Sequence, residues 1–97
     1  MALRPLAYPK VGSWWLSTER NVNNVYRVVV VEEARRTYTK MGHQGGIVAF
    51  YPARMSDPKA QRLAMYELPY KDFVRIHREL EGEELAEVQA LILLANV

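Results

Sequence analysis

The 97-residue chain contains no cysteine. This absence excludes disulfides, thiolate catalysis and zinc sites that need cysteine ligands. Long hydrophobic runs are also missing, because no stretch approaches the roughly 18 consecutive apolar residues of a membrane span. Residues 1–5 lack the apolar run that a signal peptide needs. We therefore expect a cytoplasmic protein with no membrane partner.

Histidine, the usual general base near neutral pH, is scarce as well. The two histidines, His43 and His77, have no sequence neighbours arranged like a catalytic triad or a metal pair. The glycine-rich segment 42–46 precedes an apolar run, whereas a phosphate-binding loop opens a helix and is followed by Lys-Ser/Thr. We therefore predict no catalytic residue, no cofactor and no metal, and interpret the chain as non-enzymatic.

The composition is that of an ordinary globular protein, with 49% hydrophobic and 25% charged residues. The length fits one domain and exceeds the roughly 40 residues below which disulfides or metals are usually needed. We expect a single domain over residues 1–97, with a barrel at 11–77 and a helical segment at 79–97.

The net charge of +2 conceals a division along the chain. All 13 Lys and Arg residues lie at or before Arg78 together with six acids, which leaves residues 1–78 with a charge of +7. The remaining segment carries five glutamates and no basic residue. Such asymmetry is typical of an interaction surface. Acids are also favoured in the first turns of helices by the macrodipole, and this second explanation is the plainer one.

The segment Val25–Glu33 is the clearest β-strand of the sequence. It holds five valines and a tyrosine in nine residues, a composition that favours a strand. Alternation places Val28 and Val30 on one face, and Val29 and Val31 on the other. Both faces are apolar, so we expect both to be buried. A small barrel has only one interior, so we expect the C-terminal helix, either of the same chain or of a second copy, to cover the outer face.

Further strands are predicted from short apolar or aromatic runs bounded by glycine, proline or asparagine. They are 12–17, 35–41 as a bent continuation of the valine strand, 47–51 and 63–68. Residues 70–80 allow two interpretations: a helix with Phe73, Ile76 and Leu80 on one face, or a short strand through 73–77. Residues 83–96 are predicted to form a helix with acids in its first turns and an apolar stripe.

Several of these features occur together in one class of small β proteins. They are Gly12 with Trp14 on the first strand, the Tyr26–Val31 strand, the Gly46–Tyr51 strand, and Leu68-Pro69 followed by Phe73. Their order resembles the small SH3-like barrels of phage and bacterial accessory proteins, and the Tudor- and KOW-type modules. The resemblance implies a mainly β (α+β) fold, a small SH3-like barrel or curled antiparallel sheet with one or two C-terminal helices. By analogy it implies a phage or mobile-element accessory role.

The leading functional hypothesis is a non-catalytic protein-interaction module that self-associates as a homo-oligomer or docks onto a protein partner. Trp14 and Trp15 point to opposite faces of a strand, so one is expected in the core. The other is expected either to be an exposed anchor, because tryptophan is enriched at interface hot spots, or to pack under residues 1–10, and the sequence does not decide which of the two is exposed. The predicted interface consists of Trp15, Leu85, Val88, Leu91 and Ile92.

A basic cluster supports a second hypothesis, a nucleic-acid-binding barrel. Its residues are Arg35, Arg36, Tyr38 and Lys40. Basic side chains beside an aromatic ring suit phosphate contact combined with base stacking. The same residues would also suit a solvated edge strand that uses charge to block aggregation.

A third hypothesis is a small oligomeric enzyme with its site at a symmetry axis. Gly46–Tyr51 resembles a strand of the plasmid-borne type II dihydrofolate reductases, which are SH3-like tetramers. Those enzymes line their pore with a Val-Gln-Ile-Tyr strand. The corresponding stretch here, Leu63–Tyr66, lacks the glutamine, so we place this hypothesis below the two binding hypotheses.

Overall fold

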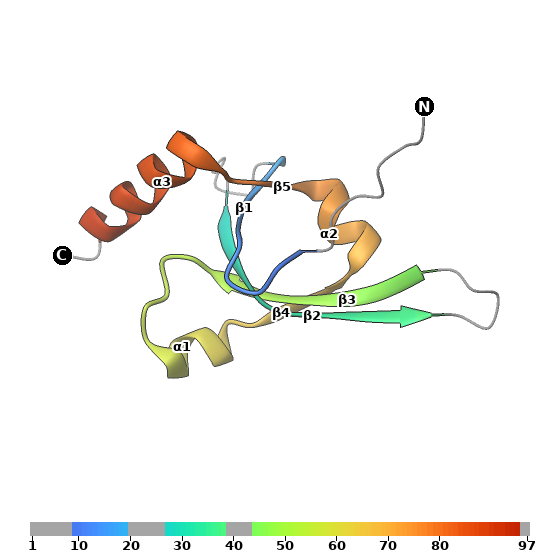
Figure 1. The fold of residues 1–97 in the computed structure, drawn as a ribbon. Helices are drawn as coiled ribbons and strands as arrows, with labels where there is room; N and C mark the ends of the chain where they lie inside the picture. Colours follow the sequence, from blue (N-terminus) through green and yellow to red (C-terminus); the bar gives the residue numbers. More distant parts are fainter. Residues whose placement is uncertain (1–8, 20–26, 39–43, 96–97) are drawn as a thin grey trace, which may run out of the picture.

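The computed structural model describes residues 9–19, 27–38 and 44–95. Its elements are β1 (Trp14–Ser17), β2 (Val28–Tyr38), β3 (Gln44–Pro52), α1 (Pro58–Leu63), β4 (Tyr66–Pro69), α2 (Tyr70–Ile76), β5 (His77–Glu79) and α3 (Gly82–Ala95). The five strands form one antiparallel sheet in the order β4-β3-β2-β1-β5 (Figure 1). The predicted α+β class, a small antiparallel sheet with a C-terminal helix, is confirmed.

The sheet is not closed into a barrel, because among the described strands β4 and β5 are edges that do not pair with each other. The helix α2 explains this opening. It follows β4 directly at Tyr70 and leads directly into β5 at His77, so its seven residues span the distance between the two edges. A helix of that length is about 10 Å long, roughly twice the spacing of hydrogen-bonded strands.

The valine strand continues beyond its apolar run to Tyr38, as predicted, and it bends. The register with β3 passes from Val31↔Phe50 to Glu33↔Ala49, so Glu32 is an extra residue in β2. Such a bulge bends a strand and increases its twist. The predicted bend therefore occurs a few residues earlier than the segment 35–41. Positions 25–26 and 39–41 of the predicted strand lie outside the described residues.

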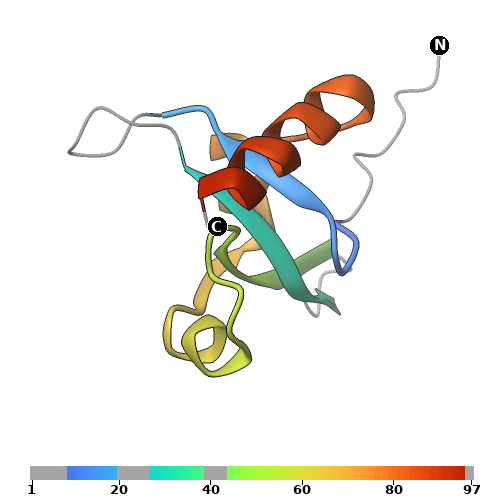
Figure 2. The ribbon, with the colours of Figure 1, turned by 90° about the vertical axis from the view of Figure 1, so that its left-hand side faces the viewer.

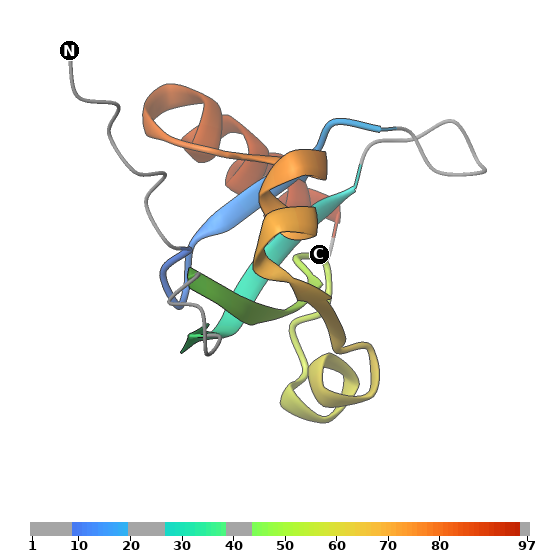
Figure 3. The same ribbon diagram turned by 90° about the vertical axis from the view of Figure 1, so that its right-hand side faces the viewer.

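The core lies between the curved sheet and α2, which crosses the sheet on one side (Figure 3). Its buried residues are Trp15, Val29, Val31, Val48, Phe50 and Phe73. Phe73, the buried residue of α2, is completely inaccessible to solvent. Its ring centroid lies 5.1 Å from that of Trp15 and 5.1 Å from that of Phe50. The face of β2 that carries Val29 and Val31 is therefore covered by α2.

The opposite face of β2 is also buried at its centre. Val30 is 6% exposed and pairs with Trp14 of β1 and Tyr51 of β3, both half-buried. The C-terminal helix α3 lies on this side, away from α2 (Figure 2). None of the residues of α3 is buried. The prediction that the valine strand is buried on both faces is thus confirmed at Val29, Val30 and Val31. The prediction that the C-terminal helix of the same chain covers the outer face is wrong, because Val30 is flanked by Trp14 and Tyr51 and, among the described residues, α3 is not packed closely on β2.

Two segments differ from the sequence prediction. The predicted strand 63–68 is shortened to Tyr66–Pro69, because α1 extends through Leu63. Asp57 caps this helix, accepting a hydrogen bond from the Lys59 amide at 3.4 Å, and Pro58 suits its first position. These helix-start signals outweigh the strand tendency of the apolar run that begins at Leu63. Leu63 ends α1 instead and is 90% exposed. Of the two alternatives for residues 70–80, the helix is confirmed over Tyr70–Ile76 and the strand through 73–77 is wrong, because β5 begins only at His77.

Replacing Phe73 with alanine tests the role of α2 in the core. We expect Phe73→Ala to lower the free energy of unfolding by about 3–5 kcal/mol, because it leaves a cavity between Trp15 and Phe50. The matched control is Leu63→Ala on exposed α1, which should change the free energy by less than about 0.5 kcal/mol. Urea unfolding followed by tryptophan fluorescence measures both. Equal effects of the two substitutions would contradict the assignment of the core.

His77 places a titratable ring against this core. It is 4% exposed, its ring stacks on Phe73 with centroids 4.4 Å apart, and Nδ1 lies 3.0 Å from the Phe73 carbonyl oxygen. This geometry assigns the proton of the neutral ring to Nδ1, which donates to the carbonyl. Burial lowers the pKa of His77, the hydrogen bond to Phe73 opposes this, and the positive charge of Arg27 lowers the pKa further.

The lowered pKa of His77 predicts a loss of stability in mild acid. Between its ordinary pKa of about 6.5 and its lower pKa in the fold, the unfolded chain binds a proton that the folded chain excludes. The free energy of unfolding should therefore fall as the pH drops below about 6.5. His77→Gln should flatten this slope between pH 8 and 5. A wild-type slope retained in His77→Gln would show that other groups cause it.

Candidate interaction surface

The direction of α3 is set by the short connection that follows β5. Leu80 is 1% exposed, and its amide donates a 2.9 Å hydrogen bond to the Trp14 carbonyl, which holds the end of β5 against β1. Gly82 then adopts a φ of +58°, a conformation that side-chain-bearing residues rarely adopt. The chain turns here and α3 leaves the sheet (Figure 1).

An exposed ion pair ties the first turn of α3 to β5. The Arg78 guanidinium donates two hydrogen bonds to the Glu84 carboxylate, at 2.6 and 2.7 Å. Hydrogen bonding and opposite charge raise the pKa of Arg78 and lower the pKa of Glu84. Two parallel bonds fix direction better than one. The pair therefore orients the start of α3, and nothing equivalent among the described residues holds its C-terminal half.

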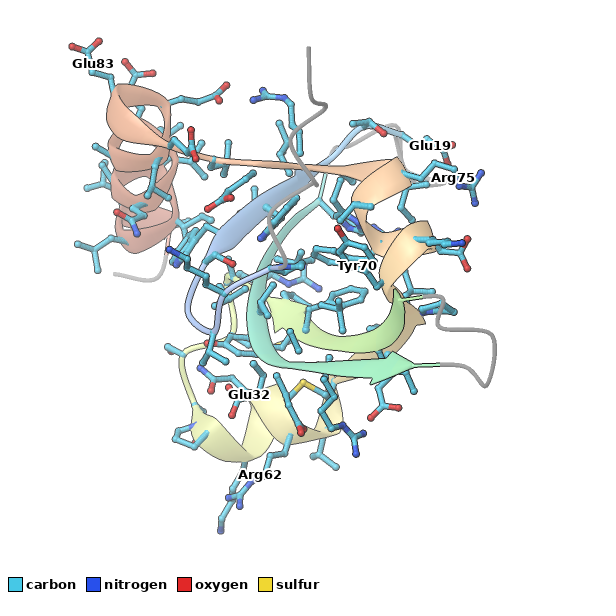
Figure 4. The ribbon with its side chains drawn as sticks, turned by 45° about the vertical axis from the view of Figure 1, so that its right-hand side comes forward. Glu19, Glu32, Arg62, Tyr70, Arg75 and Glu83 are labelled. Carbon is cyan, nitrogen blue, oxygen red and sulfur yellow. The ribbon has the colours of Figure 1, made fainter. Side chains whose placement is uncertain are left out.

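The surface of α3 changes character along its length. Leu85, Val88 and Ile92 form a half-buried stripe. The opposite stripe advances by three or four residues from Glu84 through Glu87 and Leu91 to Leu94, so these four share one outward face. It is acidic where the helix begins and apolar where it ends. Figure 4 shows Glu83, also in the first turn, pointing away from the sheet.

The apolar end of α3 is open to solvent. Leu91, Leu93 and Leu94 are 67%, 69% and 71% exposed. No charged residue follows Glu87 in the sequence. Large leucines that cluster on a surface mark an interaction site more often than isolated ones do. Leu91 and Leu94 are three residues apart and share one face of α3, whereas Leu93 lies on another side of the helix. We call the pair Leu91 and Leu94 the leucine patch.

The predicted interface residues fall into three environments. Leu91 is exposed, as an interface residue requires, whereas Leu85, Val88 and Ile92 lie half-buried on the other side of the helix. Trp15 is 7% exposed, and its Nε1 donates a 2.8 Å hydrogen bond to Ser13 Oγ. Trp15 is therefore a core residue and does not have the exposure that its place in the predicted interface requires.

The sequence does not show that Trp15 is buried or that Leu93 and Leu94 are exposed. Alternation separates the two tryptophans but does not say which face of β1 meets α2. The predicted interface does not include Leu93 or Leu94, because apart from Leu91 its helix residues follow the half-buried stripe. The signal that could have found them is the absence of charge after Glu87.

The residues of the basic cluster lie in or near the distal part of β2. The Arg35 side chain is 60% exposed and its Nε lies 3.2 Å from Glu33 Oε1. Arg36 and Tyr38 pair with Gly46 and Gln44 of β3. Lys40 lies outside the described residues. Successive positions of a strand alternate between its faces, so positions 35 and 36 do not share one.

Among the described residues, no three histidine, aspartate or glutamate side chains are grouped so that they could hold a metal ion. No helix in the same part of the chain combines the length and the apolar character needed to cross a bilayer.

Comparison of the chain with protein-family models, with curated proteins and with solved structures gives no match. Function is therefore inferred from the surfaces of this chain. The two that stand out are the leucine patch on α3 and the basic end of β2.

Proposed function

We propose that the chain is a non-catalytic interaction module that self-associates through α3. The observation that carries this proposal is the leucine patch, which is more than two-thirds exposed on a helix with no buried residue. Burying a leucine side chain from water contributes roughly 1.5–3 kcal/mol. A second copy of the same helix offers an apolar surface of matching size. Association of two copies would remove both leucine patches from water.

The size of α3 limits the strength of this association. The helix has 14 residues and is therefore about 21 Å long. One face of such a helix is much smaller than the roughly 800 Å² that each partner contributes to a standard interface. We expect a reversible dimer with a dissociation constant in the micromolar range, not an obligate assembly.

The charge pattern of α3 favours one arrangement of the two helices. In a parallel pair, Glu84 and Glu87 would face their own copies, and like charges across an interface oppose association. In an antiparallel pair that crosses near Leu91 and Leu94, the acidic ends point away from each other while the apolar ends overlap. We therefore propose the antiparallel crossing.

For the fold itself we propose an SH3-like relationship. The strand order β4-β3-β2-β1-β5 supports it, because four strands follow one another in the sheet and the fifth returns to pair with the first. The bulge at Glu32, which curls the sheet toward α2, is a second support. A solved structure of a relative with the same order and a closed barrel would strengthen this proposal, and one with another order would refute it.

A single substitution in the leucine patch tests self-association. Sedimentation velocity over a range of protein concentrations should show a monomer–dimer equilibrium for the wild-type chain. Leu94→Glu should shift it to monomer by at least about tenfold in the dissociation constant, because two charges would be buried in the interface. The matched control is Leu63→Glu, the same change at an exposed leucine on α1. A wild-type chain that stays monomeric throughout, or two variants that behave alike, would refute the proposal.

The cysteine-free sequence allows a second test of the arrangement. Single-cysteine variants at Leu94 and at Glu87 are oxidised under mild conditions, and cross-linked dimers are counted on a non-reducing gel. The antiparallel crossing predicts efficient cross-linking through Leu94→Cys and little through Glu87→Cys. A parallel pair would cross-link well through both, because identical positions then lie side by side. The association itself is read separately from the sedimentation data.

A further inference from the structure

The junction between α2 and β5, at one edge of the sheet (Figure 1), buries a titratable side chain, His77. This residue follows the last residue of α2 and is the first residue of β5. Its ring lies nearly parallel to that of Phe73, with an interplanar angle of 18°, and edge-on to that of Phe50, with centroids 5.5 Å apart. His77 therefore closes one side of the aromatic core, in which Phe73 is completely inaccessible to solvent.

β5 is a short edge strand that is held differently at its two ends. It has three residues and pairs with β1 alone among the described strands. At the His77 end, the Thr18 amide donates a 2.8 Å hydrogen bond to the Ile76 carbonyl. At the other end, the Leu80 amide donates to the Trp14 carbonyl, and the Leu80 side chain is 1% exposed. A buried leucine therefore anchors one end of β5, and the imidazole of His77 anchors the other.

The surroundings of the imidazole favour its neutral form. β1 and β3 contain no charged residue. The charged side chains of α2 and β5 reach solvent, and they are Lys71, Asp72, Arg75, Arg78 and Glu79. Burial lowers the pKa of His77, the hydrogen bond to the Phe73 carbonyl opposes this, and the positive charge of Arg27, directly before β2, lowers the pKa further. Charging the ring in place is therefore costly.

Protonation of His77 is thermodynamically linked to its release from this position. A charged imidazole against Phe73 and Phe50 lacks the solvation that water provides once the ring has moved out. Above its ordinary pKa of about 6.5 the ring is neutral in both arrangements. Below that pH, and above the lower pKa of the buried ring, each pH unit favours the open arrangement by up to about tenfold. Mild acid therefore promotes opening at this end of β5.

We propose that His77 is an acid-released latch on the aromatic core. On protonation, His77 leaves Phe73 and the hydrogen bond between Thr18 and Ile76 breaks, while the buried Leu80 keeps the far end of β5 on β1. The opening is local, and in this it differs from the global loss of stability in acid. It uncovers the face of Phe73 on which the imidazole stacks. In mild acid the protein thus offers an aromatic surface that it covers at neutral pH, and this device does not depend on the leucine patch.

Hydrogen exchange of the wild-type chain, followed by NMR, tests the latch because two neighbouring amides report on the two sides of β1. The Thr18 amide donates to Ile76 toward β5, and the Ser17 amide donates to the Arg27 carbonyl toward β2, both at 2.8 Å. We expect the protection factor of Thr18 to fall about five- to tenfold between pH 7.5 and 5.5. Ser17 should remain more protected than Thr18 at both pH values. Low concentrations of urea should accelerate exchange at Ser17 more than at Thr18, because a local opening exposes little surface.

Two variants separate the charge of the ring from its packing. His77→Phe keeps an aromatic ring against Phe73 but does not titrate, so the protection factor of Thr18 should no longer change with pH. The matched control is Arg75→Gln, which removes an exposed charge from α2 and should retain the wild-type pH dependence. The dye anilinonaphthalenesulfonate should fluoresce more strongly with the wild-type chain at pH 5.5 than at pH 7.5, because Phe73 is uncovered, but not with His77→Phe.

Several outcomes would overturn the proposal. One is a protection factor of Thr18 that is the same at pH 7.5 and 5.5. Another is equal protection of Thr18 and Ser17 at pH 5.5, with equal sensitivity to urea, because the opening would then be global. A third is an acid-induced loss in His77→Phe as large as in the wild-type chain, and a fourth is dye fluorescence that does not rise in acid. The wild-type comparison of the two amides decides the question even if His77→Phe does not fold.

Discussion

The fold depends on the packing of one ring, Phe73, between the two halves of the sheet. Phe73 contacts Trp15 of β1, Phe50 of β3 and His77 of β5, so it joins strands from the centre and one edge of the sheet. The helix that carries it connects the edge strands β4 and β5 without intervening residues. The same helix therefore fills the concave face and keeps the sheet open. Aromatic contacts of this kind contribute beyond the area they bury.

This arrangement leaves α3 outside the core. On one face of β2, α2 covers the apolar core residues. On the other face, Val30 is already flanked by Trp14 and Tyr51. α3 is held at its start by the Arg78–Glu84 pair, and its leucine patch has no partner among the described residues of this chain.

Local sequence patterns predicted most of the elements, because strands rich in valine and aromatics and a helix with acids at its start are encoded by neighbouring residues. Val28–Tyr38, the strand at Ile47 and the helix after Gly82 follow this rule. What could not be predicted depends on contacts between distant residues. The burial of Trp15 depends on where Phe73 lies, and the opening of the sheet depends on a helix inserted between its edges. For the candidate sites, the sequence indicated the apolar helix and the basic cluster, but not the exposure of Leu93 and Leu94.

The central claim is that Phe73 and α2 complete the core while α3 does not. A chain that ends after Glu81 tests this claim most directly, because it removes α3 and leaves every residue of the aromatic core in place. The account predicts that this shorter chain keeps the near-ultraviolet circular dichroism of the packed aromatic rings and unfolds in one cooperative thermal transition. A shorter chain that lacks both signals would contradict the account and would show that α3 is part of the core.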